Sequence, residues 1–236
     1  MRGIILAGGT GSRLGELSRL TNKHLLPVGN KPMIYHPIEK LTAIGIDDIM
    51  IVTGTEHAGD IFSLLGSGSR FNCRFTYRVQ DEAGGIAQAL SLAEDFASGC
   101  GGVVVLLGDN IFEESLETYH KAFQKHNGKS CLLVLKQVED PTRYGVVDIK
   151  DNKITNILEK PHNPPSDLCV TGIYFYPNSV FDYTSMCNRS DRGEYEITDV
   201  NMYYVRAGNI DYEVMSGWWT DAGTPESYRK ANELVQ

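Results

Sequence analysis

The stretch that decides the fold is IILAGGTGSRLGELSRLTNKHLLPVGNKP, residues Ile4 to Pro32. It begins as a short apolar strand, breaks into glycines, and then presents Arg13 and Lys23. A glycine-rich loop after a first strand exposes backbone N–H groups that can approach an anion closely. The stretch therefore predicts a loop that faces phosphate at the end of the first strand of an α/β sheet.

Two familiar phosphate-binding loops fit this stretch poorly. A Walker A loop requires GxxxxGK[ST], and no Gly-Lys-Ser/Thr occurs here, which argues against a P-loop NTPase. The glycine spacing of residues 9–15 resembles a dinucleotide-binding turn, but that turn needs an acidic residue at the end of the second strand. Asp47 and Asp48 precede that strand instead. A Rossmann dehydrogenase is the second interpretation of the motif alone, and a purely structural glycine turn is the third.

The overall charge excludes one class of partner. The chain has 236 residues with a net charge of −8, whereas nucleic-acid binding needs a basic face that displaces counterions from phosphates. Residues 1–40 nevertheless hold six Lys/Arg against two Glu, a local charge of +4. This pattern fits a small anionic ligand near the N-terminus, or a basic surface patch.

The cysteines and the apolar runs indicate a cytoplasmic protein. The five cysteines are widely spaced, odd in number, and form no CxxC pair, so we expect free thiols rather than disulfides or a zinc site. The first apolar run is too short for a signal peptide, and no run reaches membrane-spanning length. We therefore expect no membrane partner.

Strands and helices alternate in the first part of the chain, about residues 1–140. The predicted strands are Ile4–Leu6, Asp48–Val52, Phe75–Val79, Val103–Leu107 and Cys131–Leu135. The predicted helices are Pro32–Ala43, with Pro32 in the first turn, Ala58–Leu65, Ile86–Phe96 and Leu116–Lys125. Continuous apolar strands separated by helices are typical of a mostly parallel sheet with helices on both faces.

The pattern changes in the second part, about residues 141–236. A hairpin is predicted from Val146–Ile149 and Ile154–Glu159, followed by strands at Cys169–Tyr176 and Ile210–Met215. Helices are predicted at Ser179–Met186, at Thr198–Arg206 and from Pro225. Because no repeat or linker separates the parts, we interpret residues 1–236 as one domain whose second part forms a lid or substrate-binding lobe.

Two N-terminal motifs, LAGGTGSRL and TNKHLLPVGNKPMIYHPI, closely resemble the signature of the sugar-1-phosphate nucleotidylyltransferases. Seven further segments resemble that family in the same order: VQDEAGGIAQAL, VVVLLGDNIF, DPTRYGVVDI, ILEKP, CVTGIYFYPNSVF, RGEYEITDVN and WTDAGTPESY. The resemblance implies a Rossmann-like sheet with a sugar-binding lobe of antiparallel strands. It is greatest for the thymidylyl-transferring members, which implies an enzyme that converts dTTP and α-D-glucose 1-phosphate into dTDP-glucose and pyrophosphate, a step toward dTDP-rhamnose.

The resemblance also implies a nucleotide site. The residues that it implies are Gly8, Gly9, Thr10, Gly11, Ser12, Arg13, Lys23, Gln80, Gly85 and Asp109. Arg13 and Lys23 would contact the leaving pyrophosphate, and an arginine fork suits several phosphate oxygens at once. Gln80 and the backbone at Gly85 would read the pyrimidine edge, because an amide can pair with thymine or uracil.

A metal and a sugar subsite complete the implied site. Asp109 and Asp221 would bind Mg²⁺, which needs only one or two protein carboxylates beside phosphate and water. The implied sugar subsite consists of Tyr144, Gly145, Glu159, Lys160 and Val170, with a backbone contact from Gly172. Lys160 and Arg192 would neutralise the sugar phosphate. Adjacent strand residues point to opposite faces, so Glu159 and Lys160 can reach one ligand only across a twist or bulge.

Three functional hypotheses follow from these motifs. The first is the thymidylyl enzyme, the second a relative that uses UTP, CTP, ATP or another hexose phosphate, and the third a non-catalytic nucleotide sensor. The third predicts lost charged groups, yet Arg13, Lys23, Asp109, Lys160 and Asp221 are all present. Longer family members continue into C-terminal helices that build a regulatory site and part of the oligomer interface. We therefore expect a short-form homo-oligomer, a tetramer or a dimer, with altered feedback.

Overall fold

The computed structural model describes residues 1–9, 11–18, 21–125 and 129–236, and its centre is a nine-stranded sheet. The strands are β1 (Arg2–Ala7), β4 (Asp48–Gly54), β5 (Arg74–Gln80), β6 (Val103–Leu107), β8 (Cys131–Gln137), β9 (Gly145–Lys150), β10 (Lys153–Glu159), β11 (Leu168–Tyr176) and β12 (Ile210–Val214). The order β10-β9-β11-β6-β1-β4-β5 forms the main path, and β8 pairs with both β11 and β12.

The sheet is mixed, with a parallel core. Strands β6, β1, β4 and β5 run parallel, and so do β8 and β12. Strand β11 pairs antiparallel with β6, β8 and β9, so the antiparallel half begins at β11. The predicted α/β fold with a parallel core and antiparallel strands in its second part is confirmed.

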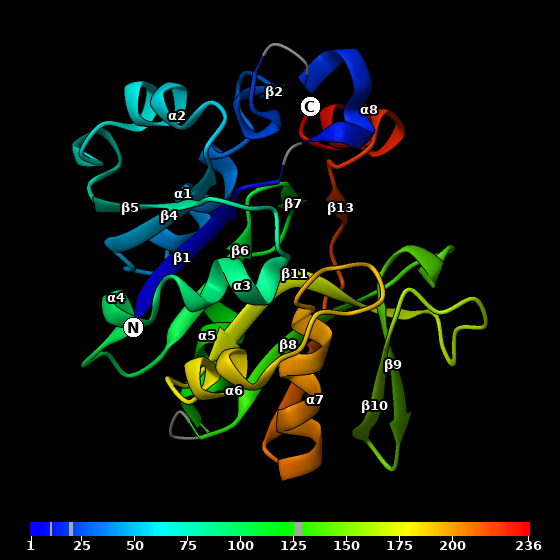
Figure 1. Cartoon of the computed structure of the whole chain (residues 1–236). Coiled ribbons are helices and arrows are strands. Elements are labelled where there is room, and N and C mark those ends of the chain that lie inside the picture. The colour runs from blue at the N-terminus through cyan, green and yellow to red at the C-terminus, as the bar shows by residue number, and fades with distance from the viewer. Residues whose placement is uncertain (10, 19–20, 126–128) are drawn as a thin grey trace.

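Helices cover both faces of the sheet because its core strands are apolar on both sides. One face packs against α3 (Ile86–Ser91), α4 (Glu94–Ala97), α6 (Val180–Met186) and α7 (Ile197–Ala207). The other packs against α1 (Tyr35–Thr42), α2 (Ala58–Leu65) and α5 (Glu117–Lys125). In β1, Ile4 and Leu6 face the first layer, and Ile5 and Ala7 face the second. Figure 1 shows β1 in the middle of the sheet, between β4 and β6.

A third, smaller core joins the two ends of the chain. It brings together two short ribbons, β2 (Pro27–Val28) with β3 (Lys31–Pro32) and β7 (Asn110–Phe112) with β13 (Trp219–Asp221), and helix α8 (Pro225–Leu234). The Tyr228 hydroxyl donates to the carbonyl of Pro27 at 2.6 Å. Figure 1 shows α8 and the C-terminus beside β2, so the final helix packs next to the glycine loop.

Several boundaries differ from the predictions. Pro32 lies in β3 rather than in a helix, because residues 27–32 form a tight ribbon that turns at Gly29 with φ +64°. The helix predicted over Ile86–Phe96 breaks into α3 and α4 around Leu92 and Ala93. The three-residue strands β7 and β13 were not predicted, because ribbons that short carry no periodic signal.

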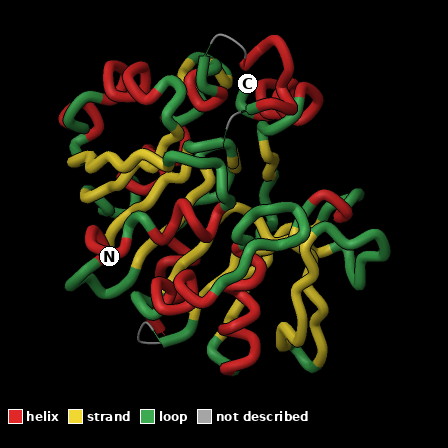
Figure 2. The backbone as a smooth tube through the Cα atoms, viewed as in Figure 1, coloured by secondary structure: helices red, strands yellow, loops and turns green. Residues whose placement is uncertain are grey.

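The predicted hairpin is confirmed as β9 and β10. Its turn places Asp151 and Asn152 in the left-handed region, with φ +49° and +60°, which suits a tight hairpin turn. Figure 2 shows these two strands side by side at one end of the sheet, and helix α7 packs against β10. All five cysteines are free thiols. Among the described residues, no helix is both long and apolar enough to cross a bilayer.

The buried position of β6 leads to a stability prediction. Leu106 is fully buried between β1 and β11, whereas Leu158 of β10 is 39% exposed. We expect Leu106→Ala to lower the free energy of unfolding by about 2–5 kcal/mol, because it removes apolar contact and leaves a cavity. The matched change Leu158→Ala should cost much less. Urea unfolding of both variants measures this, and equal losses would contradict the assignment of β6 to the core.

Candidate active site

Two cavities meet beyond the carboxyl ends of β1 and β6, where open α/β sheets bind their ligands. The larger cavity has a volume of about 640 Å³ and the smaller one about 140 Å³. Arg13, Asp109 and Lys160 line both. A ligand in one cavity would therefore share these charged groups with a ligand in the other.

The cavities gather the residues singled out from the sequence into two sets. The larger cavity is lined by Gly8, Gly9, Gly11, Ser12, Arg13, Lys23, Gln80, Gly85, Asp109, Lys160 and Arg192. The smaller one is lined by Arg13, Asp109, Tyr144, Gly145, Glu159, Lys160, Val170, Gly172 and Asp221. Thr10 lies outside the described residues. The two sets overlap with the nucleotide and sugar groups of the sequence prediction, except that Arg192, expected at the sugar phosphate, lines the larger cavity, and the roles of all these residues stay predictions.

The glycine loop packs tightly where it leaves β1. A side chain on Gly8 would place its Cβ 2.6 Å from Gln80 Oε1, so any other residue there would displace the Gln80 amide. Gly11 has φ +68°, and its carbonyl accepts a hydrogen bond from the Ser18 hydroxyl at 2.7 Å. Asn22 Nδ2 donates to the carbonyl of Ala7 at 3.3 Å. These contacts fix the path of the loop along the larger cavity.

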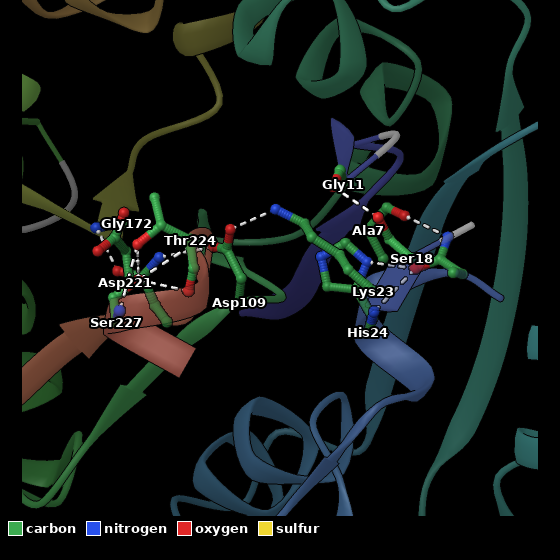
Figure 3. Close-up of polar contacts among 12 residues, drawn as sticks. Ala7, Gly11, Ser18, Lys23, His24, Asp109, Gly172, Asp221, Thr224 and Ser227 are labelled. Atoms are coloured by element: carbon green, nitrogen blue, oxygen red, sulfur yellow. Dashed lines mark hydrogen bonds and ion pairs between the residues drawn. The ribbon is translucent and has the colours of Figure 1, made fainter. Parts of the chain in front are cut away.

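A buried ion pair joins the loop region to β6. Lys23 Nζ bonds to Asp109 Oδ2 (Figure 3). Both residues are only 8% exposed. Burial by itself raises the pKa of Asp109, but the charge of Lys23 and the hydrogen bonds from Lys23 and Asn110 lower it and outweigh burial. The net effect holds that pKa well below its usual range. The carboxyl of Asp109 is therefore ionised at neutral pH.

His24 lies beside this pair and was not singled out from the sequence. Its backbone N–H donates to Asn22 Oδ1 at 2.9 Å, and its Nδ1 lies 2.7 Å from the same oxygen. The donation from Asn22 Nδ2 to Ala7 fixes the orientation of the Asn22 amide, so the atom that faces His24 is the oxygen Oδ1. Because this oxygen can only accept, His24 Nδ1 carries the imidazole proton. Burial and the charge of Lys23 lower the pKa of His24 to about 3. A neutral imidazole therefore packs under the ion pair and adds no competing charge.

Asp221 reaches the same region from the far end of the chain. It pairs with Asn110 across the β7–β13 ribbon, and the N–H of Ala222 donates to the carbonyl of Asp109 at 2.8 Å. The Tyr144 hydroxyl donates to Asp221 Oδ1 at 3.0 Å, and Arg143 lies 3.3 Å from Oδ2. Burial is the main cause that raises the pKa of Asp221, and the negative charge of Asp109 raises it further.

The two carboxylates converge above Gly223. A Cβ placed on Gly223 would lie 3.5 Å from Oδ2 of both Asp109 and Asp221, and 3.4 Å from the guanidinium of Arg13. Two carboxylates that repel each other across a shared space can be neutralised by a divalent cation. Within the described residues, no group of three or more His, Cys, Asp or Glu could hold a metal alone. Such a cation would need oxygens from phosphate or water as well.

Glu159 and Lys160 both reach the cavities because the backbone turns between them. Lys160 has φ +43°, a left-handed conformation that ends β10, and its N–H donates to the carbonyl of Tyr144 at 2.9 Å. Glu159 Oε1 lies 3.3 Å from Lys160 Nζ and accepts from Arg192 at 3.1 Å. The expected twist is thus a single residue in the left-handed region.

Several contacts in the site were missed or differ from expectation. Arg143 binds Asp221, and the Thr198 hydroxyl donates to Glu159 Oε2 at 2.6 Å, yet neither residue was nominated. Both lie in motifs already noted, DPTRYGVVDI and RGEYEITDVN, which was the available signal. The Gly172 N–H donates to Asn110 Oδ1 at 2.9 Å, so the expected backbone contact to a ligand cannot come from that group.

Comparison with known proteins gives consistent matches along the whole chain. The family model described as nucleotidyl transferase matches residues 2–236. A glucose-1-phosphate thymidylyltransferase from Neisseria gonorrhoeae is 42% identical over 241 residues, covering 100% of this chain and 83% of that protein. A low-salt glycan biosynthesis nucleotidyltransferase from Haloferax volcanii is 38% identical and matches 100% of this chain and 66% of its own length.

Solved structures agree with these matches. The crystal structure of a proposed glucose-1-phosphate thymidylyltransferase from Bacillus anthracis, in complex with sucrose, is 54% identical with a TM-score of 0.95 and covers 100% of this chain and 95% of that chain. A UDP-glucose pyrophosphorylase bound to UDP-glucose is 23% identical with a TM-score of 0.85 over 99% of this chain and 97% of that chain, which is a likeness of fold alone.

The left-handed conformation of Lys160 leads to a prediction about stability. A residue with a Cβ loses roughly 1–2 kcal/mol of stability through strain in this left-handed conformation. Glycine avoids that strain but loses roughly 0.5–1 kcal/mol through its larger backbone entropy in the unfolded chain. We expect Lys160→Gly to unfold in urea with a free energy about 0.5–1 kcal/mol higher than Lys160→Ala. At Lys153, in ordinary strand conformation, the same comparison should favour alanine. The same preference at both sites would argue against strain at Lys160.

Proposed function

Because the chain belongs to the nucleotidyl transferase family, we propose that it transfers a thymidylyl group from dTTP to α-D-glucose 1-phosphate, giving dTDP-glucose and pyrophosphate. The family makes the chain a nucleotidyltransferase, and its relatives support a sugar 1-phosphate as acceptor. The choice of dTTP and glucose rests on the relatives named above.

One observation carries the proposal: the two cavities share a wall that contains Arg13, Asp109 and Lys160. Both reactants are polyanions, and the reaction requires their phosphates to meet. Holding them in line can supply roughly 7–11 kcal/mol in favourable cases, and fixed cations must also offset the repulsion. A nucleotide in the larger cavity and a sugar phosphate in the smaller one would meet at this charged wall.

Lys160, which lines both cavities, and Arg192, which lines the larger one, would hold the attacking sugar phosphate where the two cavities meet. The attacking phosphate oxygen is already ionised at neutral pH, so no general base is needed to remove a proton from it. Glu159 accepts hydrogen bonds from Arg192 and Thr198, which fixes its carboxylate beside the smaller cavity, where it could accept from sugar hydroxyls. These groups would position the sugar phosphate so that its phosphate lies at the wall that the two cavities share.

Arg13 and Lys23 would bind the leaving pyrophosphate. An ammonium has three N–H donors, so Lys23 can keep its bond to Asp109 and still donate to phosphate oxygens. The guanidinium of Arg13 lies near Gly223, between the two carboxylates and the larger cavity. Both cations would stabilise negative charge as it moves onto the pyrophosphate.

Asp109 and Asp221 fit a magnesium ion, because their oxygens converge above Gly223 with few other protein donors. When bound, Mg²⁺ would withdraw charge from the α-phosphate of the nucleotide. Arg143 and Tyr144 hold Asp221 in place, and Asn110 Nδ2 donates to Asp109 Oδ1 at 3.0 Å. These contacts keep the two carboxylates facing each other before any ligand arrives.

Release of pyrophosphate tests the proposed reaction directly. With glucose 1-phosphate and Mg²⁺, we expect the highest kcat/KM with dTTP among dTTP, UTP, CTP and ATP. The amide of Gln80, which lines the larger cavity, would pair with the edge of a pyrimidine base and so disfavour ATP, whereas the preference for dTTP over UTP is expected from the relatives. Absence of turnover with dTTP, or much faster turnover with CTP or ATP, would refute this substrate assignment.

The role of Lys160 predicts a loss of catalysis. Lys160→Ala should lower kcat by ~10²–10³, by analogy with removal of one donor to a developing charge. Lys153→Ala, an exposed lysine at the other end of the same strand, is the control and should retain full activity. Steady-state kinetics under saturating substrates measures both. Normal kcat in Lys160→Ala would mean that the sugar subsite lies elsewhere.

The metal assignment predicts weaker cation binding when Asp221 loses its charge. Asp221→Asn should weaken the binding of Mn²⁺, used here as a probe for Mg²⁺, at least about tenfold. Even residues that only hydrogen-bond to a metal ligand contribute about 10–100-fold to metal affinity. The electron paramagnetic resonance signal of free Mn²⁺, titrated with protein and dTTP, measures this without turnover. Asp148→Asn, on β9, is the control. Unchanged Mn²⁺ binding in Asp221→Asn would exclude Asp221 as a ligand.

A further inference from the structure

We propose that Gln88 is a positioning residue that fixes which atom of Gln80 faces the nucleotide base, and thereby makes the cleft select pyrimidines that donate a proton at N3. Gln88 lies on α3 and does not line the larger cavity, whereas Gln80 does. It would act on base choice only through Gln80. This inference rests on the proposed function, because it concerns the same nucleotide site.

The backbone determines the orientation of both side-chain amides. The N–H of Gly84 donates to the Gln88 side chain at 3.0 Å, and since a backbone N–H can only donate, the atom that it meets is the oxygen Oε1. The Gln80 atom that lies 2.8 Å from this oxygen must then be a donor, which is Nε2. That Nε2 also lies 3.2 Å from the carbonyl oxygen of Gly85, a second obligatory acceptor.

These backbone anchors are themselves held firmly. The N–H of Tyr195 donates to the carbonyl of Gly84 at 2.7 Å, and the N–H of Ala87 donates to the carbonyl of Tyr195 at 3.1 Å. Gly85 has φ +102°, and a Cβ there would lie 2.5 Å from the Tyr195 oxygen. Residues 84–87, which orient the two glutamine side chains, are therefore held by backbone hydrogen bonds to Tyr195.

Only the oxygen of Gln80 remains for a ligand. Both Nε2 hydrogens are used, by Gln88 and by Gly85. Gln80 Oε1 accepts no hydrogen bond from the residues that the structure describes, and it lies against Gly8 at the start of the glycine loop. Gln80 is only 7% exposed, so a base that offers this oxygen no hydrogen-bond donor would leave it without a partner, and water could hardly take the place of that donor.

A fixed carbonyl oxygen distinguishes the pyrimidine bases. Thymine and uracil carry a hydrogen on N3 and can donate to it, whereas N3 of cytosine is an acceptor and would oppose it lone pair to lone pair. A freely rotating amide could turn its NH₂ group toward cytosine instead. Gln88 prevents that rotation. The arrangement is insensitive to the 5-methyl group, so it separates thymine and uracil from cytosine but not from each other.

Nucleotide binding by the full chain tests the role of Gln88. Isothermal titration calorimetry with Mg²⁺ and dTTP, dUTP or dCTP, without sugar phosphate, measures affinity in the absence of turnover. We expect the unaltered protein to bind dCTP at least about tenfold more weakly than dTTP. In Gln88→Met, which has no comparable acceptor, this ratio should fall about fivefold or more. Gln88→Glu keeps an acceptor for both donors and should retain the original ratio.

The outcomes separate this inference from its alternatives. A dCTP-to-dTTP ratio that stays unchanged in Gln88→Met would overturn it, as would equal relaxation in Gln88→Glu. A change in the dUTP-to-dTTP ratio would also overturn it, because only a general loosening of the pocket affects the 5-position. Thermal melting checks that the variants fold, and Gln88→Leu replaces methionine if that variant does not. Failure of the unaltered protein to bind dTTP would instead refute the proposed function.

Discussion

The ion pair between Lys23 and Asp109 is the interaction on which the cleft depends. Its partners come from the turn after the glycine loop and from the end of β6, and both are almost completely buried. Removing one partner of such a pair leaves an uncompensated charge, at a cost of about 3–5 kcal/mol, whereas the intact pair adds little net stability. Its value is therefore in placing a cation and an anion side by side at the carboxyl end of β6, where the proposed nucleotide and metal ion would each need one of them.

Around this pair, Asn110 connects the segments that arrive from elsewhere in the chain. Its Nδ2 donates to Asp109, while its Oδ1 accepts from the backbone of Gly172 and from the indole of Trp219 at 2.7 Å. One amide thus ties β6 and β7 to β11 and β13. Because β13 ends in Asp221, the same contacts determine how the second carboxylate faces the first. The cleft is preorganised by neutral hydrogen bonds that hold its charges in position, which low-dielectric surroundings strengthen.

The sequence predicted the parts of this arrangement that have a periodic or motif signal. Apolar runs such as Val103–Leu107 identified the core strands, and the loop motif identified Arg13 and Lys23. The ribbons β7 and β13 could not be predicted, because three residues carry no period and their pairing joins positions about 110 residues apart. The partners Arg143 and Thr198 were missed for a related reason: a side chain that orients a functional group is defined by three-dimensional contact, not by its spacing in the sequence.

Lys160 shows why such sites depart from local preference. A strand that continued through this residue would point Glu159 and Lys160 to opposite faces, and one of them would be lost to the cavities. The left-handed turn brings both inward but strains a side-chain-bearing residue that glycine would replace without strain. Glycine has no charge to offer a phosphate, so the position keeps a lysine in a conformation that lysine disfavours. The conflict between backbone preference and charge is itself an argument that the ammonium of Lys160, rather than the turn, is what the site requires.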